Sequence, residues 1–348
     1  MSSGEISSRE VEASPELSAQ VDALLALCGD GMTPHHQQLL METVMLICHD
    51  HSTADIKMMA RVMAEIRQGM ELFAPYARRR KVSLFGSART PSDSVRYQLG
   101  IAMGRALADA GFMVITGGGG GMMQAANEGA GEESSFGINI NLPMEQAPNH
   151  VVVNSPRHFY CQYFFTRKLF FLKESCAVIL TPGGFGTLDE GFETLTLLQT
   201  GRNPPMPVVM LEAPGDDFWG PFLRSWMRRL QQDGLINSED DKLLLHTDSV
   251  EVALEHIQSF YTNYHSFRYV GRWMLLRMQR PLSPTALERL NAEFSDVLSR
   301  GEIEQVECWP KGDDIEWAHL PRLRLQLDRH RMSVLPQIIR RANALTEC

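Results

Sequence analysis

The chain has 348 residues, enough for one large α/β domain with additions or for two ordinary domains. Its apolar fraction of 44% and charged fraction of 22% are those of a soluble globular protein. The formal charge of −9 argues against non-specific nucleic-acid binding, which needs a positive surface.

The cysteines are scattered along the chain, and no CxxC pair occurs, so we expect neither a zinc ribbon nor a disulfide framework. The first residues lack a basic stretch followed by an apolar one, and no run of about 18 uncharged apolar residues occurs anywhere. We therefore expect no secretory signal and no membrane span, and a reducing cytoplasm as the compartment. Cys176 opens an apolar run and is interpreted as a small buried hydrophobe rather than a nucleophile.

The N-terminal region, residues 1–78, has a helical pattern. After a polar start, apolar residues recur at helical spacing from Leu17 to about Phe73, and Ser52 or Thr53 is placed to cap a third helix. Cys48-His49-Asp50-His51 lacks the i, i+4 partners that a helical metal site needs. We expect helices here, no strand before residue 81, and no metal.

In the central region, residues 79–265, short β-rich runs alternate with helical stretches. Such nearly continuous apolar strands with helical crossovers predict a parallel sheet covered on both faces, in a doubly wound, Rossmann-like α/β fold. The predicted strands are Lys81–Phe85, Phe112–Thr116, Phe136–Ile140, Cys176–Thr181, Met206–Leu211 and Leu243–His246. The predicted helices cover about residues 93–110, 121–131, 157–174, 186–200, 217–232 and 249–261.

Residues 266–348 form a mixed C-terminal extension in which this alternation stops. The segment that includes Trp273 and Leu275 is compatible with a strand or a helix, and Ser283-Pro284-Thr285 resembles a helix start. The rest of the extension has no assignable pattern.

Three small-residue turns follow predicted strands: Gly86-Ser87, Gly117 to Gly121, and Pro182 to Thr187. In a doubly wound sheet, ligands bind beyond the carboxyl ends of the strands. Backbone N–H groups at a helix N-terminus, unobstructed by side chains, form an anion site there. Three such turns at one edge therefore predict a bound anion.

The glycine turns do not match the common nucleotide motifs. Gly121 is followed by Met122-Met123 where a P-loop has Lys and Ser or Thr. A dinucleotide fingerprint needs a third Gly or Ala, and that position holds Met122 or Met123. The next strand also ends without an acidic residue for a ribose diol. We expect a nucleoside monophosphate rather than NAD.

Two readings of Thr187 and Glu190 remain open from the local pattern. Thr187-Leu188-Asp189-Glu190 fits a capping box, in which both side chains satisfy free N–H groups of the helix. Alternatively, Thr187 donates to a phosphate and Glu190 projects into the cleft, where its carboxylate favours positive charge on the sugar.

Arg167 lies at helical spacing from Tyr163, Phe164, Phe170 and Phe171. A guanidinium among aromatic rings is expected to be partly buried and to need an anionic partner. That partner is a ligand, or else Glu174 or Glu190 in a structural pair. Lys168 has similar aromatic neighbours.

Taken together, these residues resemble the LOG family of cytokinin riboside 5′-monophosphate phosphoribohydrolases, often labelled lysine decarboxylases. The family signature Pro-Gly-Gly-x-Gly-Thr-x-x-Glu is complete from Pro182 to Glu190, and the Arg-Lys pair that precedes it is Arg167-Lys168. The resemblance covers about residues 80–265. Within this range the chain is similar to the longer bacterial members of the family. No lysine stands in a pyridoxal-phosphate context that would support decarboxylation.

The resemblance implies hydrolysis of the N-glycosidic bond of a nucleoside 5′-monophosphate to a free base and ribose 5-phosphate, without cofactor or metal. It implies that Arg167 and Glu190 are catalytic. The residues expected to bind substrate are Gly86, Ser87, Gly118, Gly119, Gly120, Met122, Lys168, Gly183, Gly184, Gly186 and Thr187. Because two subunits complete each site in the family, a homodimer or larger homo-oligomer is expected.

Two alternatives remain. One is a non-catalytic carrier of a nucleotide or of molybdenum cofactor on the same fold, for which Arg167 with Glu190 is the discriminating pair. The other is that the flanking regions bind a regulatory nucleotide. Neither nucleic acid nor a membrane is expected as a partner.

Overall fold

The computed structural model describes residues 14–29, 31–49, 51–142, 147–306 and 315–346. The chain divides into two compact units that meet between Ala64 and Glu65, inside helix α3 (Thr53–Phe73). The domain boundaries that we place at residues 79 and 266 remain predictions.

The first unit is helical, as predicted. It contains α1 (Pro15–Leu27), α2 (Pro34–Cys48) and the first half of α3. Ser14 caps α1, because its side chain accepts a hydrogen bond from the Leu17 N–H at 3.2 Å. Ser52, one of the two predicted caps, accepts from the Asp55 N–H at 3.1 Å at the start of α3.

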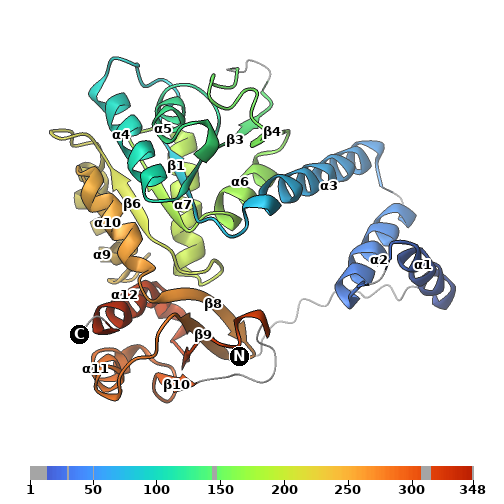
Figure 1. The fold of residues 1–348 in the computed structure, drawn as a ribbon. Coiled ribbons are helices and arrows are strands. Elements are labelled where there is room, and N and C mark those ends of the chain that lie inside the picture. Colours follow the sequence, from blue (N-terminus) through green and yellow to red (C-terminus); the bar gives the residue numbers. More distant parts are fainter. Residues whose placement is uncertain (1–13, 30, 50, 143–146, 307–314, 347–348) are drawn as a thin grey trace. The chain divides into compact units, whose positions relative to one another are not determined.

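The second unit contains a seven-stranded parallel sheet, which confirms the predicted α/β fold (Figure 1). The strand order is β4-β3-β2-β1-β5-β6-β7. Strands β2 to β4 are added on one side of β1 and strands β5 to β7 on the other, so the order of the strands reverses between β1 and β5. This switch point is where doubly wound sheets bind ligands. The strands are β1 (Lys81–Phe85), β2 (Met113–Thr116), β3 (Ser135–Ile140), β4 (His158–Cys161), β5 (Ala177–Leu180), β6 (Val208–Leu211) and β7 (Leu244–Thr247).

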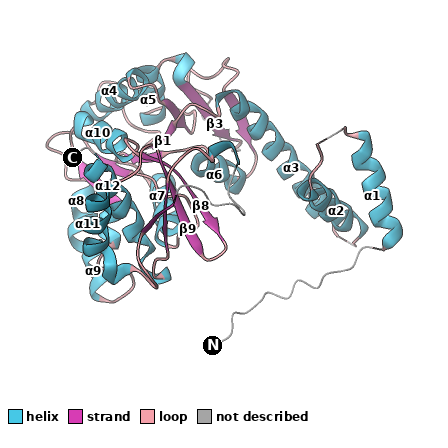
Figure 2. Cartoon of the chain, turned by 60° about the horizontal axis from the view of Figure 1, so that its bottom comes forward, coloured by secondary structure: helices cyan, strands magenta, loops and turns pink. Residues whose placement is uncertain are grey.

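Helices cover both faces of this sheet, as Figure 2 shows. On one face α4, α5 and α10 bury apolar side chains such as Met103, Ala126 and Ile257. On the other face α6, α7 and the end of α3 pack around Phe73 and Phe170. The helices of this region are α4 (Val95–Asp109), α5 (Met122–Ala130), α6 (Phe164–Lys173), α7 (Phe185–Gln199), α8 (Trp219–Pro221), a π-helical turn (Phe222–Met227), α9 (Arg228–Gln232) and α10 (Val250–Phe260).

The predicted helix over residues 157–174 is wrong in its first part. Residues His158–Cys161 form strand β4, which pairs in parallel with β3 from Gly137↔His158 to Ile140↔Cys161. The segment is short and aromatic, a composition that suits strands, and only sheet pairing with β3 distinguishes it from the aromatic helix that follows. Helix α6 begins at Phe164.

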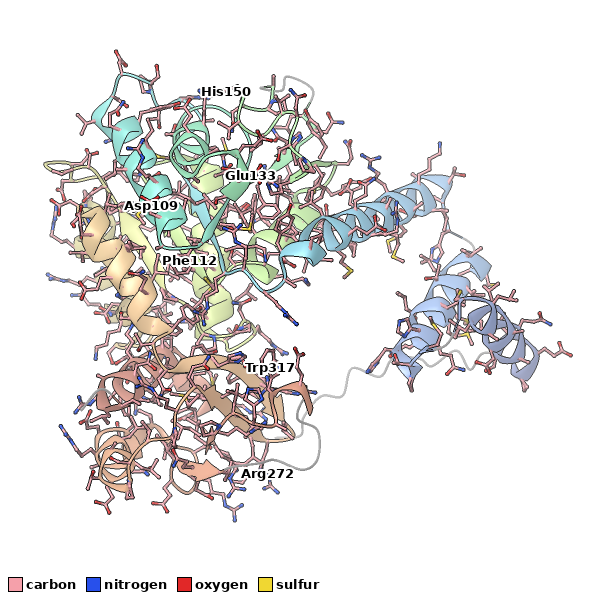
Figure 3. The ribbon with its side chains drawn as sticks, in the orientation of Figure 1. Asp109, Phe112, Glu133, His150, Arg272 and Trp317 are labelled. Atoms are coloured by element: carbon pink, nitrogen blue, oxygen red, sulfur yellow. The ribbon has the colours of Figure 1, made fainter. Side chains whose placement is uncertain are left out.

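The C-terminal extension holds a second, four-stranded antiparallel sheet of order β10-β11-β9-β8. The strands are β8 (Tyr264–Val270), β9 (Trp273–Met278), β10 (Glu304–Val306) and β11 (Arg322–Leu325), so the segment from Trp273 is a strand. Two helices close its apolar core: α11 (Pro284–Phe294), which starts at the predicted Ser283-Pro284-Thr285 segment and is capped by Ser283, and α12 (Leu335–Thr346). Figure 3 labels Arg272 and Trp317 beside this sheet.

Candidate active site

The three predicted glycine turns meet at the carboxyl edge of the sheet. The Ser87 N–H donates to the Pro182 carbonyl at 3.2 Å, which ties the loop after β1 to the loop after β5. The Met122 N–H donates to the Ser87 carbonyl at 3.0 Å, which ties in the loop after β2. Three segments far apart in sequence thus form one backbone-lined surface at the switch point.

Close backbone approach explains two of the glycines. Gly121 has φ +60°, and a Cβ there would lie 2.4 Å from the Ser87 carbonyl oxygen. A Cβ at Gly183 would lie 2.1 Å from the Thr187 hydroxyl oxygen. A side chain at Gly121 would push the loops after β1 and β2 apart, and one at Gly183 would displace the Thr187 side chain of the same loop.

These loops enclose a cleft of about 620 Å³, which lies in the size range of small-molecule sites. One wall comes from the loop after β1 and includes Gly86 and Ser87. The other comes from α7 and includes Gly184, Gly186 and Thr187, with Arg167 and Glu190 also reaching the cleft. The remaining lining residues are Phe85, Ala88, Arg89, Gly117, Met123, Phe171, Phe185 and Leu188.

Helix α7 presents its N-terminus to this cleft. Gly184 is its N-cap, with no side-chain capping bond, and the helix runs from Phe185 to Gln199. The first N–H groups of a helix have no carbonyl acceptor within it and carry its positive dipole end. The first turn of α7 is therefore placed to bind an anionic oxygen group.

The capping-box reading of Thr187 and Glu190 is wrong. Because α7 begins at Phe185, Thr187 occupies the third helical position and Glu190 the second turn. A capping box requires its Ser or Thr at the N-cap itself, which is Gly184 here. Both side chains are instead buried at the floor of the cleft, with 5% and 3% exposure.

Glu190 is a buried carboxylate whose negative charge is only partly neutralised by neighbouring cations. Its Oε2 lies 3.6 Å from Lys168 Nζ, too far for a hydrogen bond, and has no hydrogen-bond partner among the described residues. Burial raises the pKa of Glu190 to about 7, although the positive charges of Lys168 and Arg167 oppose this. The carboxyl therefore titrates in the physiological range.

Arg167 occupies the aromatic environment predicted for it. Its guanidinium lies 5.3 Å from the ring centroids of both Phe164 and Phe171. Its Nε is buried without a hydrogen-bond partner among the described residues. Burial lowers the pKa of Arg167, and the charge of Glu190 partly offsets that effect.

Glu174 is not the anionic partner of Arg167. It lies 3.4 Å from Lys81 Nζ and 2.5 Å from Lys173 Nζ at the other end of α6. The guanidinium thus faces the cleft with Glu190 as its principal anionic neighbour.

Lys168 lies behind Glu190 rather than in the cleft. Its Nζ is 2.6 Å from Glu193, 2.9 Å from Asp189 and 3.6 Å from Glu190. Burial alone would lower the pKa of Lys168, but the hydrogen bonds to Glu193 and Asp189 outweigh that effect and raise it. Its contact with a ligand is therefore indirect, through the charge that it places beside Glu190.

Several other residues expected to bind substrate do not line the cleft. Met122 is fully buried in the core between the sheet and α4, and Met123 lines the cleft in its place. The carbonyls of Gly118 and Gly119 accept hydrogen bonds from the Asn149 side-chain amide, so these residues shape the loop. Gly120 and Gly183 belong to the loops but are likewise absent from the lining.

Arg89 is a lining residue that the sequence interpretation missed. It is exposed at the mouth of the cleft, and no carboxylate of the described residues pairs with it. An arginine two residues after the Gly86-Ser87 turn was a usable signal, because that turn lies at the ligand-binding edge.

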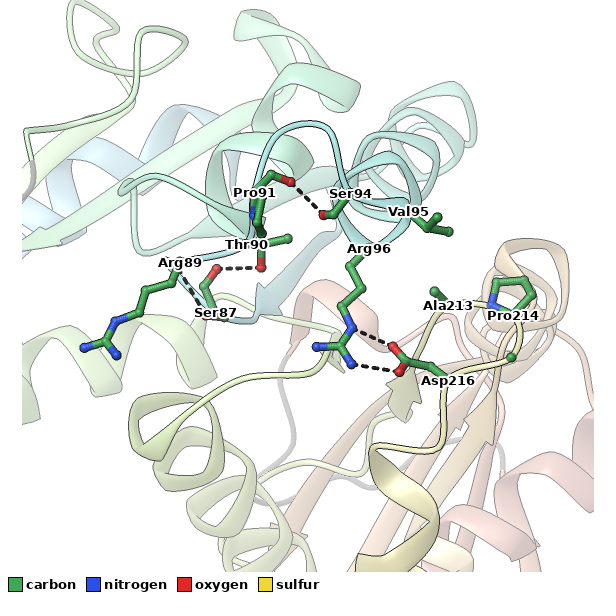
Figure 4. Close-up of a pocket in the computed structure, with 11 residues that line it drawn as sticks. Ser87, Arg89, Thr90, Pro91, Ser94, Val95, Arg96, Ala213, Pro214 and Asp216 are labelled. Carbon is green, nitrogen blue, oxygen red and sulfur yellow. Dashed lines mark hydrogen bonds and ion pairs between the residues drawn. The ribbon is translucent and has the colours of Figure 1, made fainter.

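A smaller hollow of about 500 Å³ adjoins the cleft and shares Ser87 and Arg89 with it (Figure 4). Its far side is held by Arg96, whose guanidinium donates to both carboxylate oxygens of Asp216 at 2.5 and 2.7 Å. This bidentate pair joins the start of α4 to the loop after β6. The Arg89 side chain extends away from this pair.

Within the described part of the chain, no three His, Cys, Asp or Glu side chains gather in a group able to hold a metal ion. No described helix combines the length and apolar character needed to cross a membrane.

Residues 109–257 match the family model described as possible lysine decarboxylase. Two mycobacterial proteins named cytokinin riboside 5′-monophosphate phosphoribohydrolase are similar to the chain. The protein of Mycobacterium tuberculosis is 28% identical over 48% of this chain and 88% of its own length. That of Mycobacterium marinum is 26% identical over 48% and 88%.

The solved structures that are similar to this chain have lower sequence identity than the mycobacterial proteins. A molybdenum cofactor binding protein from Rippkaea orientalis is 22% identical, covering 52% of this chain and 96% of its own, with a TM-score of 0.37. A molybdenum cofactor carrier protein from Chlamydomonas reinhardtii is 18% identical with the same coverage and a TM-score of 0.35. Over residues 109–257, this chain is thus similar to the LOG family, whose model carries the description possible lysine decarboxylase.

Proposed function

We propose that the chain hydrolyses the N-glycosidic bond of nucleoside 5′-monophosphates to a free base and ribose 5-phosphate. The observation that carries the proposal is the juxtaposition of buried Glu190 and Arg167 with the open N-terminus of α7 in one cleft. The names of the mycobacterial relatives support the same reaction class.

The phosphate binds at the first turn of α7, with Thr187 as hydroxyl donor and Arg89 at the mouth. A helix rises about 1.5 Å per residue, so Glu190 lies roughly 7 Å further along the axis than Phe185. Helical side chains lean toward the N-terminus, which brings the carboxylate back toward the first turn. This spacing suits a ribose that spans from its 5′-phosphate to its anomeric carbon.

Cleavage of the glycosidic bond develops positive, oxocarbenium-like charge at the anomeric carbon. Ionised Glu190 stabilises that charge in a site that excludes water from one side. Water then adds its hydroxyl group to the anomeric carbon, and its proton goes to the leaving base. Arg167 holds the carboxylate in place and offers N–H donors to the substrate oxygens.

We also propose that the chain forms a homodimer through the exposed aromatic surface beside the cleft. This surface is made of Phe164, Phe185 and Phe192, which are 48%, 93% and 41% exposed on α6 and α7. Exposed aromatic side chains gathered on one surface mark association sites.

The cysteines of the described residues are free thiols, which supports a reducing compartment such as the cytoplasm.

The test is base release, followed by chromatography, from AMP, GMP, CMP and N6-isopentenyl-AMP, with adenosine as the phosphate-free control. We expect at least one nucleotide to be hydrolysed and adenosine to be left intact, because the phosphate supplies the binding energy at α7. Hydrolysis of adenosine at the same rate would contradict the assigned phosphate site. Tight nucleotide binding without release of base would instead indicate a carrier.

A further inference from the structure

A second cavity, of about 700 Å³, lies on the opposite edge of the central sheet from the cleft. Its residues precede strands rather than follow them: Arg80 stands before β1, Cys176 before β5, and Met206 before β6. Side chains of α6 and α7 form one flank, and β8 of the second sheet forms the other.

The floor and flanks of this cavity are largely apolar and aromatic. Leu172, Pro205 and Met206 are buried at its base, while Phe165 and Leu169 remain about half exposed on α6. Tyr261 stands at its inner edge, where its hydroxyl donates to the Cys176 carbonyl at 2.6 Å. Such a lining suits a ring or a branched apolar group rather than a bare ion.

The charged lining is strongly positive in a protein of net charge −9. The cationic residues Arg80, Lys168, Lys173 and Arg202 face a single carboxylate, Glu193. Lys168 is already paired with Glu193, and Lys173 with Glu174. No carboxylate of the described residues pairs with Arg80 or Arg202.

Arg80 and Arg202, which pair with no described carboxylate, have different surroundings. Arg80 lies over the Tyr261 ring, with its central carbon 4.2 Å from the ring centroid. This contact fixes its position at the cavity rim but leaves its N–H donors without an anion. Arg202 is exposed on the loop after α7. Guanidinium groups with free donors form charge-assisted hydrogen bonds with carboxylate and phosphate oxygens.

Cys176 is not a nucleophile in this cavity. Burial raises the pKa of its thiol to about 12, despite the nearby charges of Arg80 and Lys81. Burial likewise lowers the pKa of His265, which disfavours a charged imidazole. The features of the cavity therefore point to binding rather than to covalent chemistry.

We propose that this cavity binds an organic anion, with an aromatic or branched apolar body on the apolar floor and a carboxylate or phosphate between Arg80 and Arg202. The site is separate from the cleft and does not depend on the proposed hydrolysis. Lys168 is the side chain common to both surroundings, because it lines the cavity and lies 3.6 Å from Glu190.

The proposal is tested by titration calorimetry of the full chain with 1-naphthoate, 1-naphthyl phosphate and inorganic phosphate. We expect saturable binding of at least one naphthyl probe and much weaker binding of inorganic phosphate, which lacks the apolar body. The stronger of the two naphthyl probes identifies the anionic group that the site prefers.

Arg202→Glu locates the binding. This exposed side chain makes no described ion pair, so the fold is expected to persist, and a matched control is Arg228→Glu on the exposed surface of α9. Loss of a charge-assisted hydrogen bond should weaken probe binding by about tenfold or more in Arg202→Glu. Binding should be unchanged in Arg228→Glu and in the cleft variant Thr187→Val.

Three results would overturn the proposal: no binding of either naphthyl probe, equal binding in Arg202→Glu and wild type, or loss of binding in Thr187→Val. The last result would place the probe in the cleft instead. Because the measurement follows binding and not turnover, an inactive enzyme would not affect it.

Discussion

Glu190 is held in an environment that opposes its negative charge, and yet it lines the cleft. The carboxylate is nearly inaccessible, and the cations nearest to it are the guanidinium of Arg167 and the ammonium of Lys168. Destabilised charges of this kind concentrate at functional sites. The sequence pattern alone left Glu190 between capping and catalysis, because the local motif does not specify at which residue the helix begins.

The raised pKa of Glu190 predicts the pH dependence of activity. If the ionised carboxylate stabilises the transition state, kcat/KM should rise with pH and level off above an apparent pKa near 7. The measurement is initial rates of base release between pH 5 and pH 9. A flat profile over this range would argue against ionised Glu190 as the acting form.

Lys168→Met should move this pH profile toward higher pH. Because the ammonium lowers the pKa of Glu190, its removal should raise the apparent pKa by up to about one unit. Asp189→Asn, which removes a carboxylate that raises the pKa of Glu190, is the matched control and should move the profile downward. Shifts in the same direction for both variants would mean that the profile does not report Glu190.

Glu190→Gln should stabilise the fold at high pH. The pKa of Glu190 in the folded state, about 7, lies above its ordinary value of 4.5. The folded chain therefore holds an extra proton between these values, and its stability falls as pH rises through this window. The loss is up to about 3 kcal/mol at pH 8. Urea unfolding should show Glu190→Gln to be the more stable protein at pH 8 and equal to wild type at pH 4.5.

At the scale of elements, α6 matters because it carries both Arg167 and Lys168. Its start is fixed by Glu65 of α3, which is fully buried and accepts hydrogen bonds from the Gln162 N–H at 2.7 Å and the Thr166 hydroxyl at 2.5 Å. An acidic side chain suits a helix N-terminus. The sequence gives no hint of this contact, because the residues are about a hundred positions apart.

Glu65→Ala should destabilise the second unit by roughly 1–3 kcal/mol, since the Gln162 N–H loses its acceptor while the Thr166 hydroxyl keeps the Tyr163 carbonyl. Glu65→Gln keeps one acceptor oxygen and should lose less. Urea unfolding followed by circular dichroism provides the comparison. If Glu65→Ala unfolds at the same urea concentration as wild type, Glu65 does not hold the start of α6.

The elements that were predicted correctly are those with a strong local signal. Strand β1 stands out as a buried apolar run before a glycine turn, and Ser283 marks α11 by its capping pattern. Strand β4 was missed because four aromatic-rich residues acquire strand geometry only through pairing with β3. In the second sheet, β11 pairs with β9 and β10 across longer stretches of sequence, whereas β8 and β9 form a local hairpin over Gly271-Arg272 that we did not assign.

For the whole molecule, the glycine loops were predictable as a group while the detailed lining was not. Each loop follows a strand of one parallel sheet, so topology alone brings them to one edge. Whether Met122 or Met123 reaches the cleft depends on how α5 is rotated against α4, and Met122 points into that interface. Such rotation follows from packing across the whole domain.

The proposed dimer has its own test in Phe185→Asp. Phe185 is the first residue of α7, where an acidic side chain is favourable, so the fold should persist. Sedimentation should show wild type as a dimer or larger and Phe185→Asp as a smaller species. Leu235→Asp, which charges an exposed apolar residue elsewhere, should sediment like wild type. Equal sedimentation of Phe185→Asp and wild type would exclude this surface as the interface.

The central claim is tested most directly by the release of adenine from AMP by wild type and Glu190→Gln, assayed side by side by chromatography. The site described here predicts that wild type yields adenine and ribose 5-phosphate in equal amounts. It predicts that Glu190→Gln is slower by about 100-fold or more, the usual loss when a group that stabilises transition-state charge is removed. An unchanged rate in Glu190→Gln would contradict the claim, and so would the absence of base release by wild type from every nucleotide of the panel that binds.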